Sequence, residues 1–223
     1  MKVGHNMTTI RIAIDGPAAA GKSTIAKRVA KKLGYLYIDT GAMYRAVTLH
    51  SLQHGDESID TIEDDVMINF DENDEVYLNN INVSKEIRSS EVTNNVSRIS
   101  AMEKVRTYLV NMQRKISEDS NVVMDGRDIG TTVLPDAEVK VFMQADPKVR
   151  ASRRLLEEQA RGNQVSLETL TEEIIRRDEI DSTREISPLV KADDAVILDT
   201  SNLTIEEAEE EIIQLVNSKL EAK

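Results

Sequence analysis

A glycine-rich segment near the start of the chain has the spacing of a phosphate-binding loop. Residues 16–23 read GPAAAGKS, which fits the pattern G-x-x-x-x-G-K-S/T in full. Glycine at the two fixed places allows backbone angles that a Cβ forbids, so successive N–H groups can surround a phosphate. Lys22 can then reach the β- and γ-phosphates of a nucleotide, and the Ser23 hydroxyl can bind Mg²⁺. The expected nucleotide contacts are Gly16, Pro17, Ala18, Ala19, Ala20, Gly21, Lys22, Ser23 and Thr24.

Polar residues also follow two other predicted strands. Asp39 and Thr40 come after the strand at 35–38, and the segment DGRDIG at 125–130 comes after the strand at 121–124. The carboxyl ends of parallel strands face one crevice. Asp125, with Asp39, is therefore a candidate to hold Mg²⁺ through water, and the Arg127 guanidinium matches a planar anion.

These segments also have simpler interpretations, which stay open. Asp39 could serve only as the cap of the following helix, and Arg45 could be a surface charge. The segment 125–130 could be a structural turn.

A predicted helix over residues 166–183 carries a stripe that begins apolar and becomes charged. Its members fall within an arc of about 100° at helical pitch: Leu167, Leu170, Ile174, Arg177, Asp181 and Arg184. Because charges on an inward stripe are costly without partners, the pattern indicates an anionic ligand. The alternative is a simple Arg177–Asp181 pair at a frayed helix end.

A group of arginines precedes Gly162, the expected flexible tip of the second half of the chain. Its members are Arg150, Arg153, Arg154 and Arg161. Phosphoryl transfer needs cations that arrive as the site closes, because catalysis rests on stabilising spreading negative charge. A solvated helix face is the alternative interpretation of this group and of Arg106 and Arg114.

The elements around these residues alternate between strand and helix. Short apolar runs predict strands at 10–15, 35–38, 121–124, 138–143 and 195–198, and helical spacing predicts helices at 22–33, 41–53, 101–117, 147–159, 166–183 and 205–220. This order predicts an α/β fold with a mainly parallel sheet. Between residues 55 and 97 the alternation stops, and only a hairpin around Asn79-Asn80 is expected there, so we mark this region as an insertion.

Composition limits the function classes. The 223 residues carry a formal net charge of −12 without a basic run, which argues against a nucleic-acid partner. No apolar run approaches the ~20 residues of a membrane span. Cysteine is absent, which excludes disulfides and agrees with a location in the cytoplasm.

Residues 1–9 are expected to be an N-terminal extension, and we expect the protein to be a monomer. His50 and His54 have metal-ligand spacing but lack the rest of a zinc motif.

With these motifs, the chain resembles the bacterial cytidylate (CMP/dCMP) kinases of the nucleoside monophosphate kinase superfamily. The similarity runs from Ile10 to the C-terminus and rests on the segments 14–24, 39–46, 83–97, 125–137 and 176–189. It implies a P-loop kinase core of five parallel strands with helices on both faces, over residues 10–54, 98–149 and 166–223. It further implies an inserted monophosphate-binding lobe at 55–97, a short lid at 150–165, and transfer from ATP to CMP or dCMP with Mg²⁺.

The resemblance also assigns residues to the acceptor and the lid. It places the CMP phosphate against Thr40, Arg45, Arg127 and Arg184, the cytosine against Ser97, Arg106 and Asp128, and the sugar against Arg177 and Asp181. Lid contacts with ATP would come from Arg153 and Arg154, and then Arg161; the catalytic group would be Lys22, Arg127, Arg184, Arg153 and Arg154. Asp128 makes physical sense in this role, because a carboxylate accepts from the N4 amino group that distinguishes cytosine from uracil.

Two other functions remain as alternatives. One is a P-loop kinase with a different small acceptor, such as UMP, AMP or a shikimate-type alcohol; the sequence lacks the glycine-rich acceptor loop expected of a shikimate kinase, and residues 150–166 are short for an adenylate kinase lid. The other is a nucleotide-binding switch without turnover, although the sequence has no N-K-x-D guanine motif.

Overall fold

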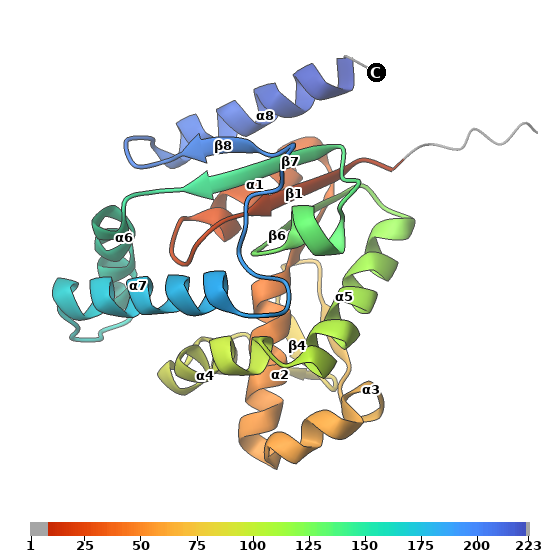
Figure 1. Ribbon diagram of the computed structural model, residues 1–223, viewed down its shortest axis with the longest axis vertical. Helices are drawn as coiled ribbons and strands as arrows, with labels where there is room; N and C mark the ends of the chain where they lie inside the picture. The colour runs from red at the N-terminus through yellow and green to blue at the C-terminus, as the bar shows by residue number, and fades with distance from the viewer. Residues whose placement is uncertain (1–8, 222–223) are drawn as a thin grey trace, which may run out of the picture.

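The computed structural model describes residues 9–221 and has a parallel β-sheet at its centre (Figure 1). The strand order is β2-β6-β1-β7-β8, and every neighbouring pair is parallel. These strands are β1 (Arg11–Asp15), β2 (Leu36–Asp39), β6 (Val122–Gly126), β7 (Val139–Gln144) and β8 (Val196–Asp199). The predicted α/β fold with five parallel strands is confirmed. Of the predicted extension, residues 1–8 lie outside the described part of the chain.

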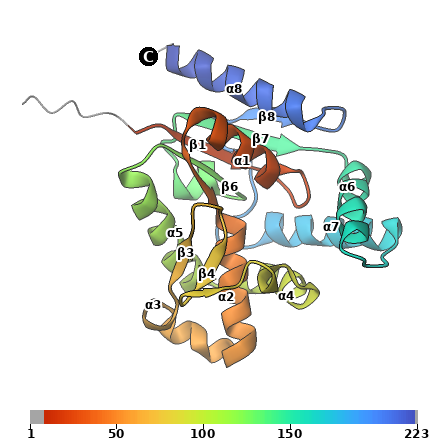
Figure 2. The same cartoon turned by 180° about the vertical axis from the view of Figure 1, so that it is seen from behind.

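Helices cover both faces of the sheet (Figures 1 and 2). One face packs against α1 (Lys22–Leu33) and α8 (Ile205–Glu221), and the other against α2 (Thr40–His54) and α5 (Glu103–Glu118). Strand alternation produces this division, because successive side chains point to opposite faces. Ile12 and Ile14 belong to the cluster with α1 and α8, whereas Ala13 belongs to the cluster with α2 and α5.

Two further helices stand beside the carboxyl ends of the strands. They are α6 (Pro147–Ala160) and α7 (Leu167–Thr183), which pack against each other. Pro147 at the start of α6 and the Asp146 cap, whose carboxylate accepts the N–H of Lys148 at 2.8 Å, fix where this helix begins. The turn between the helices contains Gly162, in the left-handed region at φ 82°. Among the described residues, no helix has the length and apolarity to cross a membrane.

The inserted region holds more regular structure than the sequence predicts. It contains a three-stranded antiparallel sheet, β3 (Ile68–Phe70), β4 (Val76–Leu78) and β5 (Ile81–Asn82), and the short helices η1 (Asp56–Thr61), α3 (Ile62–Asp65) and η2 (Glu86–Arg88). The predicted hairpin is confirmed as β4 and β5. Asn79 and Asn80 both have positive φ, 50° and 67°, as a tight two-residue hairpin turn requires.

The longest helix of this region was not predicted either. Helix α4 (Ser90–Ser100) is built from Ser, Thr, Asn and Val, which favour helices only weakly. It forms because the Ser89 hydroxyl accepts the N–H of Val92 at 3.3 Å, and because Val92, Val96 and Ile99 are buried in the core. The expected boundary of the insertion at residue 97 therefore falls inside a helix.

The insertion and the sheet share one hydrophobic cluster. Ile38 and Met124 enter it from the sheet and Met43 from α2, while Ile62 and Ile68 enter it from the insertion. The insertion thus packs into the same core as the sheet face that carries α2 and α5.

Candidate active site

The glycine-rich loop connects β1 to the start of α1. Gly16 has φ 153°, and a Cβ there would lie 2.1 Å from the Met143 carbonyl oxygen, so the strand beside it leaves room for glycine alone. Gly21, at φ 84°, begins α1. The Lys22 side chain is buried, and its Nζ donates to the Pro17 carbonyl at 2.6 Å, folding over the loop. Burial, and next the charge of Arg127, lower the pKa of Lys22.

Asp125, near the end of β6, lies beside the loop. Its Oδ2 accepts the Ser23 hydroxyl at 2.8 Å, and its Oδ1 accepts the Tyr37 hydroxyl at 2.9 Å. Burial and the nearby charge of Asp39 raise the pKa of Asp125 to about 7. Asp39 also caps α2, because its Oδ1 accepts the N–H of Ala42 at 2.8 Å.

A cavity of about 210 Å³ opens over these groups. We name it the loop cavity. Its cationic lining residues are Lys22, Arg45, Arg88, Arg127, Arg154 and Arg177, and its acidic ones are Asp39, Asp125 and Glu157. In a chain of net charge −12, this excess of cations marks an anion site. Arg45 is not a surface charge, since it donates to Ile87 O at 3.2 Å and to Thr93 Oγ1 at 2.9 Å.

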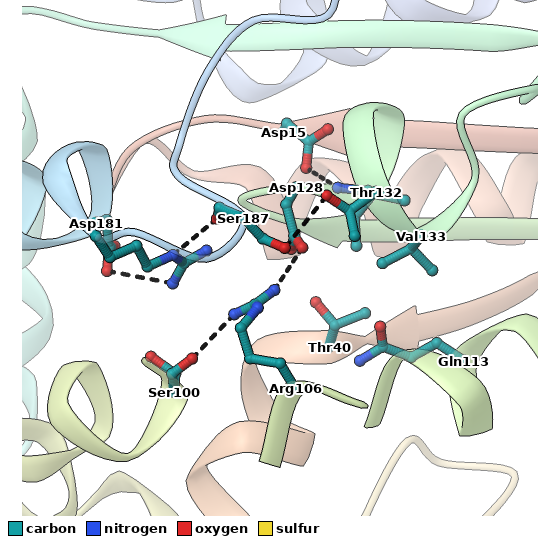
Figure 3. Close-up of polar contacts among 12 residues, drawn as sticks. Asp15, Thr40, Ser100, Arg106, Gln113, Asp128, Thr132, Val133, Asp181 and Ser187 are labelled. Atoms are coloured by element: carbon teal, nitrogen blue, oxygen red, sulfur yellow. Dashed lines mark hydrogen bonds and ion pairs between the residues drawn. The ribbon is translucent and has the colours of Figure 1, made fainter. Parts of the chain in front are cut away.

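A second, smaller cavity of about 50 Å³ adjoins the first, and we name it the turn cavity. It is lined by Thr40, Gly41, Tyr44, Val96, Ser100, Arg106, Gly126, Arg127, Asp128, Arg177, Asp181 and Arg184. Figure 3 shows Arg106 reaching from α5 between Ser100 and Asp128. It donates to the Ser100 carbonyl at 3.0 Å and forms a buried ion pair with Asp128, and its guanidinium lies 5.1 Å from the centre of the Tyr44 ring.

Several buried donors of the turn cavity have no protein partner. They are Tyr44 Oη, Arg106 Nε, Arg177 Nε and Arg184 Nη2. A buried polar group left unsatisfied costs roughly 1–3 kcal/mol. Since all four residues line one cavity, the arrangement indicates a polar ligand with several acceptor atoms.

The charged end of α7 closes this cavity. Arg127 Nε donates to Asp181 Oδ2 at 3.0 Å, and Arg184 Nη1 lies 3.9 Å from Asp181 Oδ1. Burial opposes ionisation, but the charges of Arg127, Arg177 and Arg184 together lower the pKa of Asp181. Asp181 thus forms ion pairs with Arg127 from another element and with Arg184, and the simple pairing with Arg177 at a frayed end is wrong.

Comparison with known proteins agrees with this geometry. The model of the family described as "Cytidylate kinase" matches residues 12–218. The chain belongs to the cytidylate kinase family. It is therefore a phosphotransferase.

Curated members of the family are similar over nearly the full length. The chain is 48% identical to "Cytidylate kinase" of Acholeplasma laidlawii (strain PG-8A), covering 95% of this chain and 97% of that protein. It is 52% identical to "Cytidylate kinase" of Bacillus cereus (strain ATCC 10987 / NRS 248), covering 93% and 96%.

Solved structures with a similar fold share little sequence with the chain. A shikimate kinase from Bacteroides thetaiotaomicron has a TM-score of 0.51 at 17% identity, covering 94% of this chain and 99% of that one. An uncharacterized protein from Eubacterium ventriosum ATCC 27560 has a TM-score of 0.55 at 14% identity, covering 95% and 99%. These likenesses show the P-loop kinase fold alone.

Some residues that the family resemblance assigned lie away from the two cavities. Ser97 does not line the turn cavity, whereas Ser100 does. Arg153 donates to the Thr200 carbonyl at 2.6 Å and lines a third cavity of about 280 Å³, between the loop and the start of α8. Arg161 is exposed and pairs with Glu158.

On α7, Leu167 is 41% exposed, so the predicted inward stripe begins at Leu170.

The structure also shows contacts around the loop that the sequence did not predict. Arg150 and Asp178 form an ion pair at 2.6 Å, and both bind the backbone of Ala18 in the loop. Arg150 Nη1 donates to the Ala18 carbonyl at 2.9 Å, and the Ala18 N–H donates to Asp178 Oδ1 at 3.3 Å. Asp15 accepts the N–H groups of Ile129 and Gly130. No spacing rule reveals such contacts, because they join elements far apart in the chain.

Proposed function

We propose that this protein transfers the γ-phosphoryl group of ATP to CMP, and also to dCMP, with Mg²⁺, giving ADP and the nucleoside diphosphate. ATP-dependent phosphorylation of CMP is the activity of the family to which the chain belongs. The observation that supports the residue assignment is the pair of adjoining cavities, one at the glycine-rich loop and one rich in unpartnered buried donors.

The loop cavity suits the triphosphate. Backbone N–H groups of residues 19–23 surround phosphate oxygens, and Lys22 leaves the Pro17 carbonyl to bind the β- and γ-phosphates. Arg154 lies in the same cavity and forms ion pairs with Glu157 and Glu158, from which it can turn to the phosphates. The third cavity, with Arg153 at its wall, would take the adenine.

Ser23 and Asp125 fit a magnesium ion. Their oxygens lie 2.8 Å apart at the loop cavity, and Mg²⁺ is commonly held by one or two protein oxygens together with phosphate oxygens. Burial, and next the charge of Asp39, raise the pKa of Asp125, and the charge of Lys22 offsets them only in part. When bound, Mg²⁺ supplies charge neutralisation at the β- and γ-phosphates.

The turn cavity, together with the adjoining wall of the loop cavity that carries Arg45, suits the acceptor. Arg45, Arg127 and Arg184 hold the phosphate of CMP, Arg177 and Asp181 its sugar, and Asp128 with Arg106 its base. A phosphate oxygen of CMP attacks the γ-phosphorus in line; the new O–P bond forms as the bond to the β-phosphate oxygen breaks, and ADP leaves. Positioning and charge stabilisation suffice, because a phosphate oxygen is already a competent nucleophile.

A panel of acceptors tests the function. ADP formation from ATP is measured with CMP, dCMP, UMP, AMP and shikimate at equal concentrations. Turnover restricted to CMP and dCMP supports the proposal. Turnover with UMP, AMP or shikimate alone would assign a different acceptor, and tight ATP binding without turnover on any acceptor would indicate a switch.

The lid at 150–165, the monomeric state and the cytoplasmic location stay predictions.

A further inference from the structure

Arg88 is a cation at the cleft that neither the sequence patterns nor the family resemblance assigned. It is the last residue of η2 and directly precedes Ser89, the cap of α4. It lines the loop cavity and also a neighbouring cavity of about 410 Å³, which lies between α4 and α7. Arg88 is exposed, and within residues 9–221 its side chain forms no hydrogen bond or ion pair. A guanidinium at a cavity wall is thus free to bind a ligand.

The surroundings of Arg88 favour an anion. The pKa of Arg45 is lowered to about 9 by burial first, then by the charges of Arg177 and Arg154, with Arg88 adding to them and Asp39 opposing. Several guanidinium groups therefore repel one another around one space, and a phosphate there would relieve the repulsion.

The backbone on both sides of Arg88 is fixed to the acceptor side of the cleft. Arg45, on α2, donates to the carbonyl of Ile87, which directly precedes Arg88, and to the hydroxyl of Thr93 on the first turn of α4. Ile87 itself is buried. The base of the Arg88 side chain consequently stays next to Arg45, while its guanidinium can move.

We propose that Arg88 is a further phosphate-binding residue, which the inserted region delivers to the phosphate of the acceptor nucleotide beside Arg45. This inference rests on the proposed function and extends it. Arg88 donates in the forked geometry that suits phosphate oxygens, and its charge also reaches the phosphoryl group in transfer. The neighbouring cavity gives its side chain the room to approach from the α4 side.

The test compares Arg88→Ala with Lys85→Ala. Lys85 is exposed, lies three residues earlier in the same region and lines neither cavity, so its substitution removes the same charge without touching the cleft. For Arg88→Ala we expect kcat/KM for CMP to fall about 10- to 100-fold, the equivalent of a hydrogen bond to a charged group. KM for ATP at saturating CMP should stay nearly unchanged, and Arg88→Lys should recover part of the loss.

Each result has a definite meaning. Thermal melting of both variants should match the parent, because both side chains are exposed. If Arg88→Ala behaves like Lys85→Ala, Arg88 binds no phosphate. If Arg88→Ala raises KM for ATP instead of that for CMP, the assignment to the acceptor is wrong. Failure of the proposed function would look different, since the parent protein itself would then form no ADP with CMP.

Discussion

The Asp15 carboxylate accepts the backbone N–H of Gly130 at 2.7 Å, and its other oxygen accepts the N–H of Ile129 at 2.8 Å. Asp15 ends β1 directly before the phosphate loop, and these two amides follow Arg127 and Asp128. One buried carboxylate therefore joins the two halves of the site, and the turn that bears the acceptor residues is aligned with the loop that bears the donor.

Replacing Asp15 with Asn should disturb the acceptor half of the site. Asparagine keeps one acceptor oxygen, and its amide group would face the second N–H, so we expect a loss of about 1–3 kcal/mol in the free energy of unfolding. Because the turn loosens, KM for CMP should rise more than KM for ATP. Chemical denaturation and steady-state kinetics measure the two effects, and an unchanged KM for CMP would show that Asp15 only stabilises the fold.

Replacing Asp128 with Asn should weaken the preference for cytosine. The carboxylate is an acceptor for the N4 amino group and repels the O4 of uracil, whereas an amide can serve either base. The ratio of kcat/KM for CMP to that for UMP should therefore fall. Since Arg106 loses its buried ion-pair partner, stability should fall too. A folded variant with an unaltered ratio would contradict the base assignment.

Replacing Arg184 with Ala should weaken the binding of CMP. Arg184 Nη2 is buried and unpartnered in the turn cavity, and Nε donates to the Ser187 carbonyl at 2.8 Å. Loss of a charge-assisted bond to phosphate corresponds to an increase of about 10- to 100-fold in KM for CMP. Initial-rate kinetics with each substrate varied in turn give both constants. A larger effect on KM for ATP would place Arg184 on the other nucleotide.

Two glycines with positive φ should respond differently to alanine. At Gly16 a Cβ would overlap the Met143 carbonyl, so Gly16→Ala should distort the loop and abolish ATP binding. At Gly34, with φ 70° and nothing within 4 Å of the added Cβ, the cost should be only about 1 kcal/mol of backbone strain. Calorimetric titration with ATP distinguishes them, and normal binding by Gly16→Ala would mean that the loop tolerates the overlap.

The raised pKa of Asp125 predicts how stability depends on pH. Its pKa is about 7 in the folded protein and 3.8 in its ordinary state, so between these values the folded form keeps a proton that the unfolded form releases. The contribution of Asp125 to the free energy of unfolding therefore falls as pH rises from about 4 to about 7. The difference between the parent and Asp125→Asn, measured by denaturation without nucleotide or Mg²⁺, isolates this group from Asp15. A difference that is constant with pH would contradict the shift.

The regular spacing of apolar residues predicted most of the strands and helices of the core, because each of these segments carries a clear hydrophobic pattern in its own sequence. Helix α4 escaped prediction since its residues favour other conformations and tertiary packing of Val92 and Val96 decides the outcome. Leu167 shows the opposite error, because it is an apolar residue at helical spacing that nevertheless stays 41% exposed.

Within the site, the loop at 16–24 was predictable because a single contiguous segment carries it. The family resemblance placed Arg106 and Asp128 at the same base, but their direct ion pair and the Asp15 contacts were not predictable, since each joins residues from different elements. Such pairs depend on the register between β1, β6 and α5, which no local pattern encodes. The outcome for individual acceptor residues accordingly stays a prediction.

The shared hydrophobic cluster limits what can be removed from this enzyme. A shortened chain that joined residue 54 to residue 98 would remove Ile62, Ile68 and Val96 from the cluster that also holds Met43 and Met124, and would expose apolar surface of that cluster. Such a deletion would therefore yield an aggregating polypeptide and not a smaller kinase without acceptor specificity. In this chain the segment that receives the substrate is also a wall of the core, so changes that retune the acceptor must preserve apolar packing at the same time.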